Sequence, residues 1–443
     1  MTHPKVLFLD ITLHRKDATG ITLSNLFGKW PKEKLFMMGN SSQTKMSLDA
    51  GYNNVYTLTD IEYQHIFPIN IFKSIIKANG NSDQLSANSS IIISKENRAK
   101  RTVKIGLLTL VKKKLKFLFT FLGLDLAFLR CKLSENLTKW IESSNPDCFY
   151  ALLSTRNSIL FAIEVSKKFN KPLYIHIMDD WPATIGTNTL FSNHWNKRIN
   201  SEFRTLLNIS YCRIAISEAM ASEYKTRFGG EWTFFHNPID FNFWNKSVKK
   251  SYDNNESFTL LYSGRLTQGI DNTIQKIALC IDELIESESF NIKLKIQSNT
   301  RPEWVENYKS ILFSYYIEYD LLPELYSSVD LLLLPYDFKG SGFDFIRLSM
   351  PTKAAEYMAS GTPILLIAPK STALSQYSKK YNWGYVINSD EIVDIKKGIM
   401  DLYLNKDLRS QIGEKGIEIA RNRHSIDNVQ DAFQSLFDSL KIT

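Results

Sequence analysis

Residues 330–369 read DLLLLPYDFKGSGFDFIRLSMPTKAAEYMASGTPILLIAP, and they predict one complete strand–loop–helix–strand unit. The apolar runs 330–335 and 362–368 are typical of buried strands in a parallel sheet. Between them, Pro351 stands in the first turn of a helix and Gly361 just past its end, which is the asymmetry that helix termini prefer. The stretch therefore indicates an α/β fold in which a helix connects parallel strands.

The start of this helix carries a cation and a carboxylate. In open α/β sheets, ligands bind beyond the carboxyl ends of the strands, and helix N-termini attract anions. Lys353 lies at the helix start, and Glu356 follows on the same face. Backbone amides and an ammonium group suit a diphosphate, while a carboxylate suits ribose hydroxyls, so the pair predicts a nucleotide-diphosphate site. A surface Lys–Glu pair on an ordinary helix is the alternative.

The segment also resembles the nucleotide-sugar-binding unit of GT-B glycosyltransferases, in particular the bacterial glycosyltransferase family 4 (group 1). Those enzymes often carry a proline, a small residue and a lysine, then a Glu-Tyr pair, and then a Gly-x-Pro step before a strand. The corresponding residues here are Pro351, Thr352, Lys353, Glu356, Tyr357, Gly361 and Pro363. The resemblance implies that Lys353 contacts the phosphates of a nucleotide-sugar donor and that Glu356 contacts its ribose.

One departure from the family pattern concerns the donor sugar. Many family 4 enzymes carry another glutamate at the position where this chain has Leu348. Asp344 is the candidate replacement for that contact. The predicted donor site also includes Gly342, in the loop that follows the strand, and Thr352, at the helix start.

Length and composition bound the class of protein. A chain of 443 residues predicts two domains. With 54 Lys and Arg against 46 Asp and Glu, the formal charge is +8, which suits anionic ligands or an anionic membrane surface. The basic residues do not alternate with aromatic residues in a nucleic-acid-binding motif, so nucleic acid is not an expected partner. Four widely spaced cysteines disfavour a metal site or a disulfide framework and fit a reducing cytoplasm. We expect neither a signal peptide nor a membrane-spanning run of ~18 apolar residues.

The N-terminus predicts a second ligand-facing loop. Residues 5–10 are typical of a buried first strand, and Gly20 then permits a tight turn before a helix that starts near Thr22. No Gly-x-Gly-x-x-Gly fingerprint is present. The segment resembles the first loop of family 4 enzymes, which lies near the phosphates and the acceptor, so Gly20, Thr22 and Ser24 are candidates for this loop. A plain turn between a strand and a helix is the alternative.

Residues 106–129 read GLLTLVKKKLKFLFTFLGLDLAFL, which places four lysines among leucines and phenylalanines. A basic amphipathic segment of this kind predicts contact with an anionic membrane surface. A helix that buries its apolar side on the first domain and solvates its lysines is the alternative. With the first interpretation, the protein is cytoplasmic and peripheral on the inner face of the plasma membrane.

Two adjacent carboxylates follow the strand predicted over residues 172–178. Asp179 and Asp180 stand at the carboxyl end of that strand, where burial and mutual repulsion raise the pKa of one carboxyl and make it a candidate general base. Capping of the next helix by one aspartate is the alternative. Family 4 enzymes often read His-Asp and then Trp-Pro at this place, so Asp179 stands at the histidine position. We expect the nearby His176 to be a packed residue.

The second domain opens with a strand that runs into Gly264 and Arg265. The forked guanidinium of Arg265 suits a diphosphate, and family 4 enzymes carry Gly-Arg at this place. A surface ion pair is the alternative. Those enzymes usually add a Lys-Gly step a few residues later, whereas this chain has Gln268 before Gly269, so one expected phosphate contact is missing.

The resemblance also sets the domain boundaries. Residues 1–240 form an acceptor-binding domain that includes the basic amphipathic segment, residues 241–424 form the nucleotide-sugar-binding domain, and a helix over residues 425–443 crosses back to the first domain. The polar run 245–256 predicts the linker.

Together these observations predict a GT-B fold, which consists of two Rossmann-like, doubly wound α/β domains facing a cleft. The expected reaction transfers a sugar from a UDP- or GDP-type donor to a saccharide or lipid-linked acceptor in bacterial surface-polysaccharide synthesis. It needs no cofactor or metal, because Arg265, Lys353 and the helix amides near Pro351 take the leaving-group charge. The departures at Leu348 and Asp179 leave open whether the anomeric configuration is retained or inverted. A sugar-nucleotide epimerase of the same fold and a non-catalytic sugar-nucleotide-binding partner in a membrane assembly are the alternatives.

Overall fold

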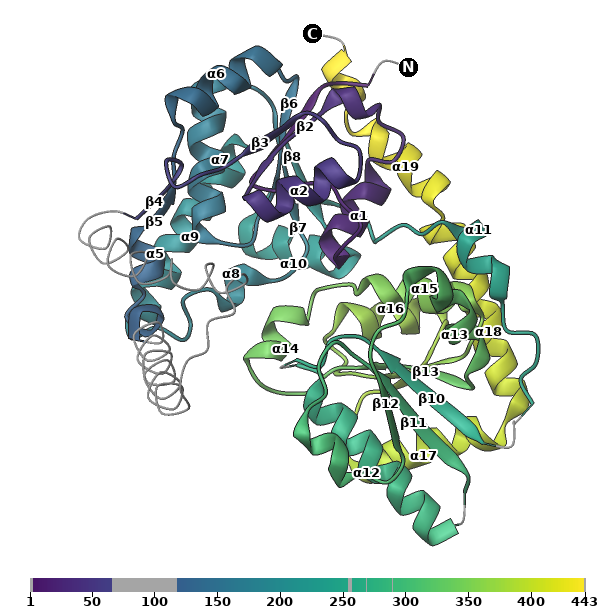
Figure 1. The fold of residues 1–443 in the computed structure, drawn as a ribbon. Coiled ribbons are helices and arrows are strands. Elements are labelled where there is room, and N and C mark those ends of the chain that lie inside the picture. Colours follow the sequence, from purple (N-terminus) through teal and green to yellow (C-terminus); the bar gives the residue numbers. More distant parts are fainter. Residues whose placement is uncertain (1–2, 66–117, 254–256, 268, 289, 442–443) are drawn as a thin grey trace, which may run out of the picture.

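The computed structural model describes residues 3–65, 118–253, 257–267, 269–288 and 290–441. These residues form two α/β units, each built around a parallel sheet (Figure 1). Gln268 and the first half of the basic amphipathic segment, residues 106–117, lie outside the described residues.

The first sheet has the strand order β3-β2-β1-β6-β7-β8-β9, and all its pairs are parallel. Its strands are β1 (Val6–Leu9), β2 (Leu35–Gly39), β3 (Val55–Thr57), β6 (Cys148–Leu152), β7 (Leu173–Ile177), β8 (Cys212–Ala215) and β9 (Thr233–Phe234). Strand β1 is buried at every position, as expected for a sheet covered on both faces. The strand order reverses between β1 and β6, and ligands of such sheets bind at this switch point, beyond the carboxyl ends of the strands.

Helices cover both faces of the first sheet (Figure 1). They are α1 (Ala18–Leu26), α2 (Ser41–Asp49), α5 (Leu124–Phe128), α6 (Glu135–Ser144), α7 (Arg156–Phe169), α8 (Trp181–Thr184), α9 (Ser192–Ile209) and α10 (Glu218–Phe228). Leu23 and Leu26 of α1 pack on one face, where they meet Val6 and Phe8 of β1. The apolar side of α7 packs on the other face.

The second sheet has the order β12-β11-β10-β13-β14-β15 and is also parallel. Its strands are β10 (Phe258–Ser263), β11 (Ile292–Gln297), β12 (Ile311–Ser314), β13 (Leu331–Pro335), β14 (Ile364–Ile367) and β15 (Tyr385–Ile387). Its helices are α12 (Asp271–Glu288), α13 (Leu322–Ser328), α14 (Ser341–Ile346), α15 (Thr352–Ser360), α16 (Ala373–Tyr381), α17 (Ile392–Leu404) and α18 (Lys406–Ile419). The predicted fold of two Rossmann-like, doubly wound α/β domains is therefore confirmed.

The unit predicted from residues 330–369 is present as β13, α15 and β14, with the short helix α14 added in the loop. Strands β13 and β14 are neighbours, with Leu332 opposite Ile364. Helix α15 ends at Gly361, which has the left-handed backbone conformation (φ 73°) that favours glycine. This unit brings the start of α15 to the carboxyl edge of the second sheet.

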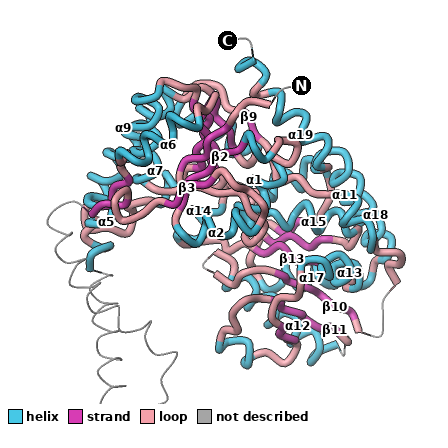
Figure 2. The backbone as a smooth tube through the Cα atoms, turned by 45° about the horizontal axis from the view of Figure 1, so that its top comes forward, coloured by secondary structure: helices cyan, strands magenta, loops and turns pink. Residues whose placement is uncertain are grey.

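The chain returns to the first domain after α18. Helix α19 (Ile426–Ser435) runs beside α1 in both ribbon views (Figures 1 and 2). Phe433 on α19 is fully buried and lies edge-on against Phe27, with 5.0 Å between the ring centroids. At the crossing, the backbone N–H of Ile239 donates to His424 O at 2.8 Å, and the N–H of Ile426 donates to Ile239 O at 2.9 Å.

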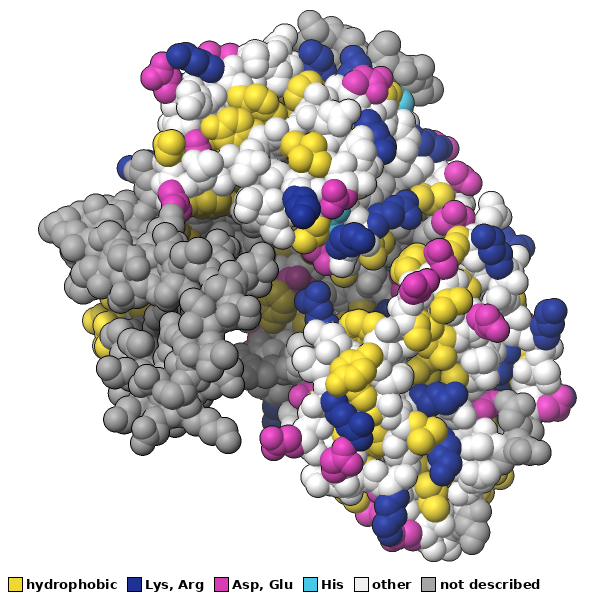
Figure 3. Space-filling model, viewed as in Figure 1, with side chains coloured by type: hydrophobic (Ala, Val, Ile, Leu, Met, Phe, Trp, Pro, Cys, Tyr) yellow, Lys and Arg dark blue, Asp and Glu magenta, His cyan; other side chains and the backbone are white. Residues whose placement is uncertain are grey.

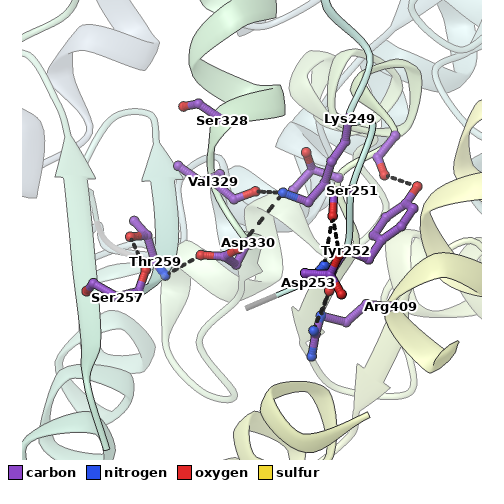
Figure 4. Close-up of polar contacts among 12 residues, drawn as sticks. Lys249, Ser251, Tyr252, Asp253, Ser257, Thr259, Ser328, Val329, Asp330 and Arg409 are labelled. Carbon is purple, nitrogen blue, oxygen red and sulfur yellow. Dashed lines mark hydrogen bonds and ion pairs between the residues drawn. The ribbon is translucent and has the colours of Figure 1, made fainter. Parts of the chain in front are cut away.

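The polar run after α11 (Phe241–Trp244) is held against the second domain (Figure 4). Lys249 donates to Val329 O at 2.7 Å, and its ammonium group lies 4.0 Å from a carboxylate oxygen of Asp330. The hydroxyl of Tyr252 donates to Gly361 O at 3.0 Å, and the guanidinium of Arg409 donates to Tyr252 O. Within the described part of the run predicted as a linker, residues 245–253, Lys249 and Tyr252 thus attach the chain to the amino-terminal side of the second sheet.

The described end of the amphipathic segment is not one continuous helix. Helix α5 is followed by a short strand, β5 (Leu129–Cys131), which pairs antiparallel with β4 (Tyr63–His65). Among the described helices, none combines the length and the apolar character that crossing a bilayer requires.

Candidate active site

A cavity of about 210 Å³ lies between the two domains. The first domain contributes Thr19 and Thr22 of α1 and Asp179 after β7, and the second domain contributes Thr352 and Lys353 of α15. The space-filling view is hollowed where the two domains meet (Figure 3). The carboxyl ends of both parallel sheets therefore border one cavity, which is where α/β proteins bind ligands.

Lys353 lines this cavity, and the buried Glu356 lies near it on the same helix, α15. Glu356 is buried, and burial raises the pKa of its carboxyl to about 7, while the nearby Lys353 opposes the shift. Burial lowers the pKa of the Lys353 ammonium to about 8, and Glu356 opposes this shift as well. The hydroxyl of Tyr319 approaches Glu356 at 3.5 Å. Neither charge is fully stabilised by the protein, so an anionic ligand at Lys353 would relieve the cost of its burial.

Two neighbours position Lys353, and neither was predicted to do so from the sequence. Its ammonium group lies over the ring of Tyr262, 4.4 Å from the ring centroid, which is cation–π geometry. A Cβ atom placed on Gly264 would lie 2.0 Å from the Lys353 Nζ, so the glycine leaves room for the lysine side chain. The only sequence signal for this role is the position of Gly264 directly after a strand.

The start of α15 completes the cation side of the cavity. Pro351 precedes the helix, and no side chain caps its first turn. Thr352 and Lys353 both line the cavity, so the first-turn amides of α15 lie beside Lys353. Backbone amides and an ammonium group at one place can bind a diphosphate.

The other predicted donor residues lie elsewhere. Arg265 is exposed, and its backbone carbonyl accepts a hydrogen bond from the Tyr262 hydroxyl at 2.7 Å. Asp344, on α14, is exposed and does not line this cavity, whose wall is formed there by Ile346. An added Cβ on Gly269 would lie 3.0 Å from the carbonyl carbon of Gly342, so these two glycines allow α14 to approach its neighbour closely.

Leu348, which stands at the family's glutamate position, is buried at the domain boundary. Its backbone carbonyl accepts a hydrogen bond from the Ser217 hydroxyl of the first domain at 2.7 Å. Two further bonds cross the boundary nearby. The N–H of Asp180 donates to Phe345 O at 3.1 Å, and the Ser349 hydroxyl donates to Asp179 at 2.6 Å. The segment after α14 is therefore attached to the first domain.

The first loop differs from the prediction in one respect. Helix α1 begins at Ala18, so Gly20 belongs to its first turn, where its N–H donates to the side chain of Asp17 at 2.7 Å. The Thr22 hydroxyl donates to Ala18 O at 2.9 Å, and this residue lines the cavity. The buried Ser24 donates to His14 O at 3.2 Å, so its hydroxyl is used within the first domain.

The two adjacent aspartates have different surroundings. Burial raises the pKa of Asp179, whose carboxylate has a hydrogen bond from Ser349 and lines the cavity. Asp180 is fully buried, and its two carboxylate oxygens accept from the Arg227 guanidinium at 2.9 and 2.7 Å. Tyr224 donates to the same carboxylate at 2.9 Å. The prediction of Asp180 as a base is corrected accordingly, because a buried carboxylate paired with arginine has a structural role.

His176 lies inside β7, and it is a packed residue as predicted. Its Nδ1 is 2.6 Å from the Tyr150 hydroxyl, and burial lowers its pKa to about 3.

A second cavity of about 290 Å³ adjoins the first one and shares Thr19, Met178 and Asp179 with it. It lies over the carboxyl ends of β1, β6 and β7, and its polar lining includes Asp10, Asp17 and Gln43. The sequence analysis missed Asp10, although it ends the first predicted strand as Asp179 ends another. Burial raises the pKa of Asp10 to about 6, and the Tyr63 hydroxyl donates a hydrogen bond to it.

Comparisons with known proteins agree with this arrangement. Residues 245–419 match the family described as "Glycosyl transferases group 1". Comparison with curated proteins gave no match. Among solved structures, sucrose-phosphate synthase from Thermosynechococcus elongatus is similar, with a TM-score of 0.61, 12% identity and 100% of both chains covered.

Two further structures show the same fold. Anabaena HepE in complex with UDP-glucose has a TM-score of 0.59 and 14% identity over 99% of this chain and 100% of that chain. A glycosyltransferase from Rickettsia africae has a TM-score of 0.60 and 10% identity over 100% of this chain and 99% of that chain. Identities this low show a shared fold. Residues 245–419 are therefore similar to group 1 glycosyl transferases, and the chain has the two-domain GT-B fold.

Proposed function

We propose that this protein is a hexosyltransferase-like glycosyltransferase, which moves a sugar from a UDP- or GDP-type donor to a saccharide or lipid-linked acceptor. The observation that carries the proposal is Lys353, which lines a cavity bordered by Asp179 of the other domain and lies beside the buried Glu356. The match of residues 245–419 to group 1 glycosyl transferases supports it. A role in bacterial surface-polysaccharide synthesis follows from the family resemblance.

The proposed chemistry divides the work between the two sheets. Lys353 and the first-turn amides of α15 bind the diphosphate and stabilise its charge as it leaves. Glu356 accepts hydrogen bonds from the ribose. Asp179 borders both cavities, and its raised pKa suits a group that takes the proton from the acceptor hydroxyl. Arg265 adds charge at the outer edge of the donor site, and the reaction proceeds without a metal ion.

A thermal-shift panel tests the donor site. UDP, GDP, ADP, CMP and NAD are added with and without EDTA to the wild type, to Lys353→Ala and to the control Lys45→Ala, which changes an exposed lysine on α2. A diphosphate at a hundred times its Kd stabilises the protein by about 2.7 kcal/mol. We expect one nucleoside diphosphate to raise the Tm in the wild type and the control, to lose this effect in Lys353→Ala, and to act equally with EDTA. A panel without any diphosphate shift would contradict the proposal.

Measurements of turnover distinguish a glycosyltransferase from the two alternative classes of protein, a sugar-nucleotide epimerase and a non-catalytic binding partner. An epimerase converts its sugar nucleotide without any acceptor. A non-catalytic partner binds the diphosphate tightly but neither transfers nor converts the sugar. The transferase proposal requires that an added acceptor accelerates diphosphate release from the donor that the thermal-shift panel identifies.

We also propose that the first domain contacts an anionic membrane. In the described residues, Leu118 and Phe121 are exposed, and so are Leu190 and Phe191 before α9. The N–H of Leu190 donates to Phe121 O at 2.7 Å, so the two segments that carry these exposed side chains lie next to each other. Apolar side chains next to a lysine-rich segment suit the headgroup region of an anionic bilayer. Changing the lysines at 112, 113, 114 and 116 to glutamate should abolish co-sedimentation with phosphatidylglycerol vesicles, and unchanged co-sedimentation would contradict the proposal.

A further inference from the structure

The second cavity has a negative lining on a positively charged protein. Three of its lining residues are aspartates, Asp10, Asp17 and Asp179, and none is a lysine or arginine. The whole chain carries a formal charge of +8, so the charge of this lining is opposite in sign to the net charge of the protein.

The described residues leave Asp10 and Asp179 without a lysine or arginine partner, whereas Asp17 lies 3.8 Å from the Nε2 of His14. Asp10 accepts a hydrogen bond from Tyr63, and Asp179 accepts one from Ser349, and both of these donors are neutral hydroxyls. Within the described ranges, no lysine or arginine pairs with Asp10 or Asp179, whereas the neighbouring Asp180 is paired with Arg227. Burial of a carboxylate without a cation nearby is unfavourable in free energy. A ligand that brings a positive charge or hydrogen-bond donors to Asp10 and Asp179 would therefore bind favourably.

The backbone of Asp10 supports a role in binding. Four non-glycine residues in the described ranges have positive φ, and the other three are asparagines at the ends of α6, α7 and α16. Asp10 (φ 54°) instead ends strand β1 at the switch point of the first sheet. Such backbone strain is typical of residues that are held in place for function.

An unused donor lies in the same wall. Trp181 is 2% exposed and lines this cavity, and its indole Nε1–H has no hydrogen-bond partner among the described residues. Most buried polar groups in proteins are paired, so an orphan indole N–H indicates a ligand that supplies an acceptor oxygen. The cavity thus offers carboxylates that accept hydrogen bonds and one donor. A sugar hydroxyl can satisfy both kinds of group.

We propose that this cavity binds the acceptor as a neutral or amino sugar and excludes acidic sugars, with Asp10 as the specificity-determining residue. The inference rests on the proposed function, because Asp179 joins this cavity to the donor cavity. Hydroxyl and ammonium groups bind the carboxylates, whereas a sugar carboxylate or phosphate is repelled by like charges in a partly buried site. A volume of about 290 Å³ is small for a ligand pocket and suits a single sugar ring.

Saturation-transfer NMR at pH 7.5 in EDTA tests the proposal with three probes: methyl glucoside, methyl glucosaminide and methyl glucuronide. Each probe is measured with and without UDP on the wild type, on Asp10→Asn and on Asp49→Asn, a control that changes an exposed aspartate at the end of α2. We expect the wild type and the control to bind the first two probes at least tenfold more tightly than the glucuronide. Asp10→Asn keeps the shape of the side chain. It should weaken the binding of the glucosaminide at least fivefold, and it should reduce the difference in affinity between the glucosaminide and the glucuronide. Trp181→Phe should weaken all three probes.

The outcomes separate this inference from the proposed function. Absence of any diphosphate shift in the thermal panel counts against the donor site alone, because the glycoside measurements are also made without UDP. Equal binding of the glucuronide and the glucosaminide, unchanged selectivity in Asp10→Asn, or no binding of any probe would each overturn the acceptor assignment. In those cases the proposal of a donor site at Lys353 would still be supported or contradicted by the thermal-shift measurements alone.

Discussion

At the scale of single residues, the properties of the candidate site come from burial of charge. Lys353 and Glu356 oppose each other's pKa shifts, and burial is the larger effect on both groups. Asp10 and Asp179 are shifted upward by burial as well. Titratable groups in a cavity with shifted pKa values are typical of functional sites, and they make ligand binding sensitive to pH.

Diphosphate binding should weaken above pH 8. The pKa of Lys353 is lowered to about 8, so the free protein loses this positive charge as the pH rises through 8, while a bound diphosphate favours the protonated form. We expect the Kd for the diphosphate to rise by up to tenfold per pH unit between pH 8 and 9.5 in isothermal titration calorimetry. Lys353→Arg, which stays charged, should show a flat profile over this range. A flat profile in the wild type would argue against Lys353 as the phosphate contact.

Gly264→Ala should reduce diphosphate binding through Lys353. The added methyl group would lie 2.0 Å from Nζ, so the lysine must leave its position over Tyr262. We expect a loss of at least tenfold in affinity with little change in Tm. The double variant with Lys353→Ala serves as the control, because it should bind no more weakly than Lys353→Ala alone. Additive losses would show that Gly264 acts by another route.

At the scale of elements, the polar run after α11 illustrates the limit of composition. Residues 245–253 have the polar composition of a mobile linker, yet Lys249 and Tyr252 bond to carbonyl groups of the second domain (Figure 4). The partners are Val329, which lies between α13 and β13, and Gly361 at the end of α15, and both come later in the chain. The polar composition of the run predicted a segment that connects the domains. Its attachment to the second domain depends on carbonyl groups that only the folded chain brings close to Lys249 and Tyr252.

Arg409→Leu should destabilise the second domain. The guanidinium of Arg409 is 2% exposed and donates to the carbonyls of Leu402 (2.5 Å), Tyr403 (2.8 Å) and Tyr252 (3.2 Å). Loss of these bonds leaves buried carbonyls unpaired, which should lower the free energy of unfolding by about 2–3 kcal/mol. Urea denaturation measures the change. The control Arg301→Leu removes an exposed ion pair with Glu306 and should change stability by less than about 1 kcal/mol. Equal effects of the two variants would contradict the structural role of Arg409.

At the scale of the whole molecule, the domains are connected at several places. The chain crosses twice, at Ile239 and at His424, where backbone hydrogen bonds pair the two crossings. The segment after α14 adds bonds from Leu348 and Ser349 to the first domain. Both cavities of the candidate site lie along this boundary, so their shape depends on how the domains are held together.

Phe433→Ala should destabilise the first domain through a helix that lies at the far end of the chain. Phe433 is fully buried on α19 and packs against Phe27. Removal of a buried aromatic ring leaves a cavity and costs about 3–5 kcal/mol. We expect a lower urea midpoint, while the exposed Leu404→Ala should behave like the wild type. An unchanged midpoint in Phe433→Ala would mean that α19 contributes little to the first domain.

Local sequence was sufficient to predict the fold class and the helix that carries Lys353 and Glu356. Buried parallel strands read as apolar runs, and helix ends carry Pro351 and Gly361, so β13, α15 and β14 follow from signals within 40 residues. The face shared by Lys353 and Glu356 follows from the helical repeat. These features depend only on neighbours in the chain, and both residues lie on α15.

Only the tertiary structure decided what each remaining carboxylate does. Asp179 and Asp180 are adjacent in sequence, but Arg227 neutralises one, while the other borders both cavities. Asp10 meets Asp179 at one cavity because the first sheet places β1 and β7 on either side of β6. A partner far away in the chain sets the charge and the hydrogen bonding of a buried group. The roles of these residues therefore depend on the packing of the sheets, which local sequence does not encode.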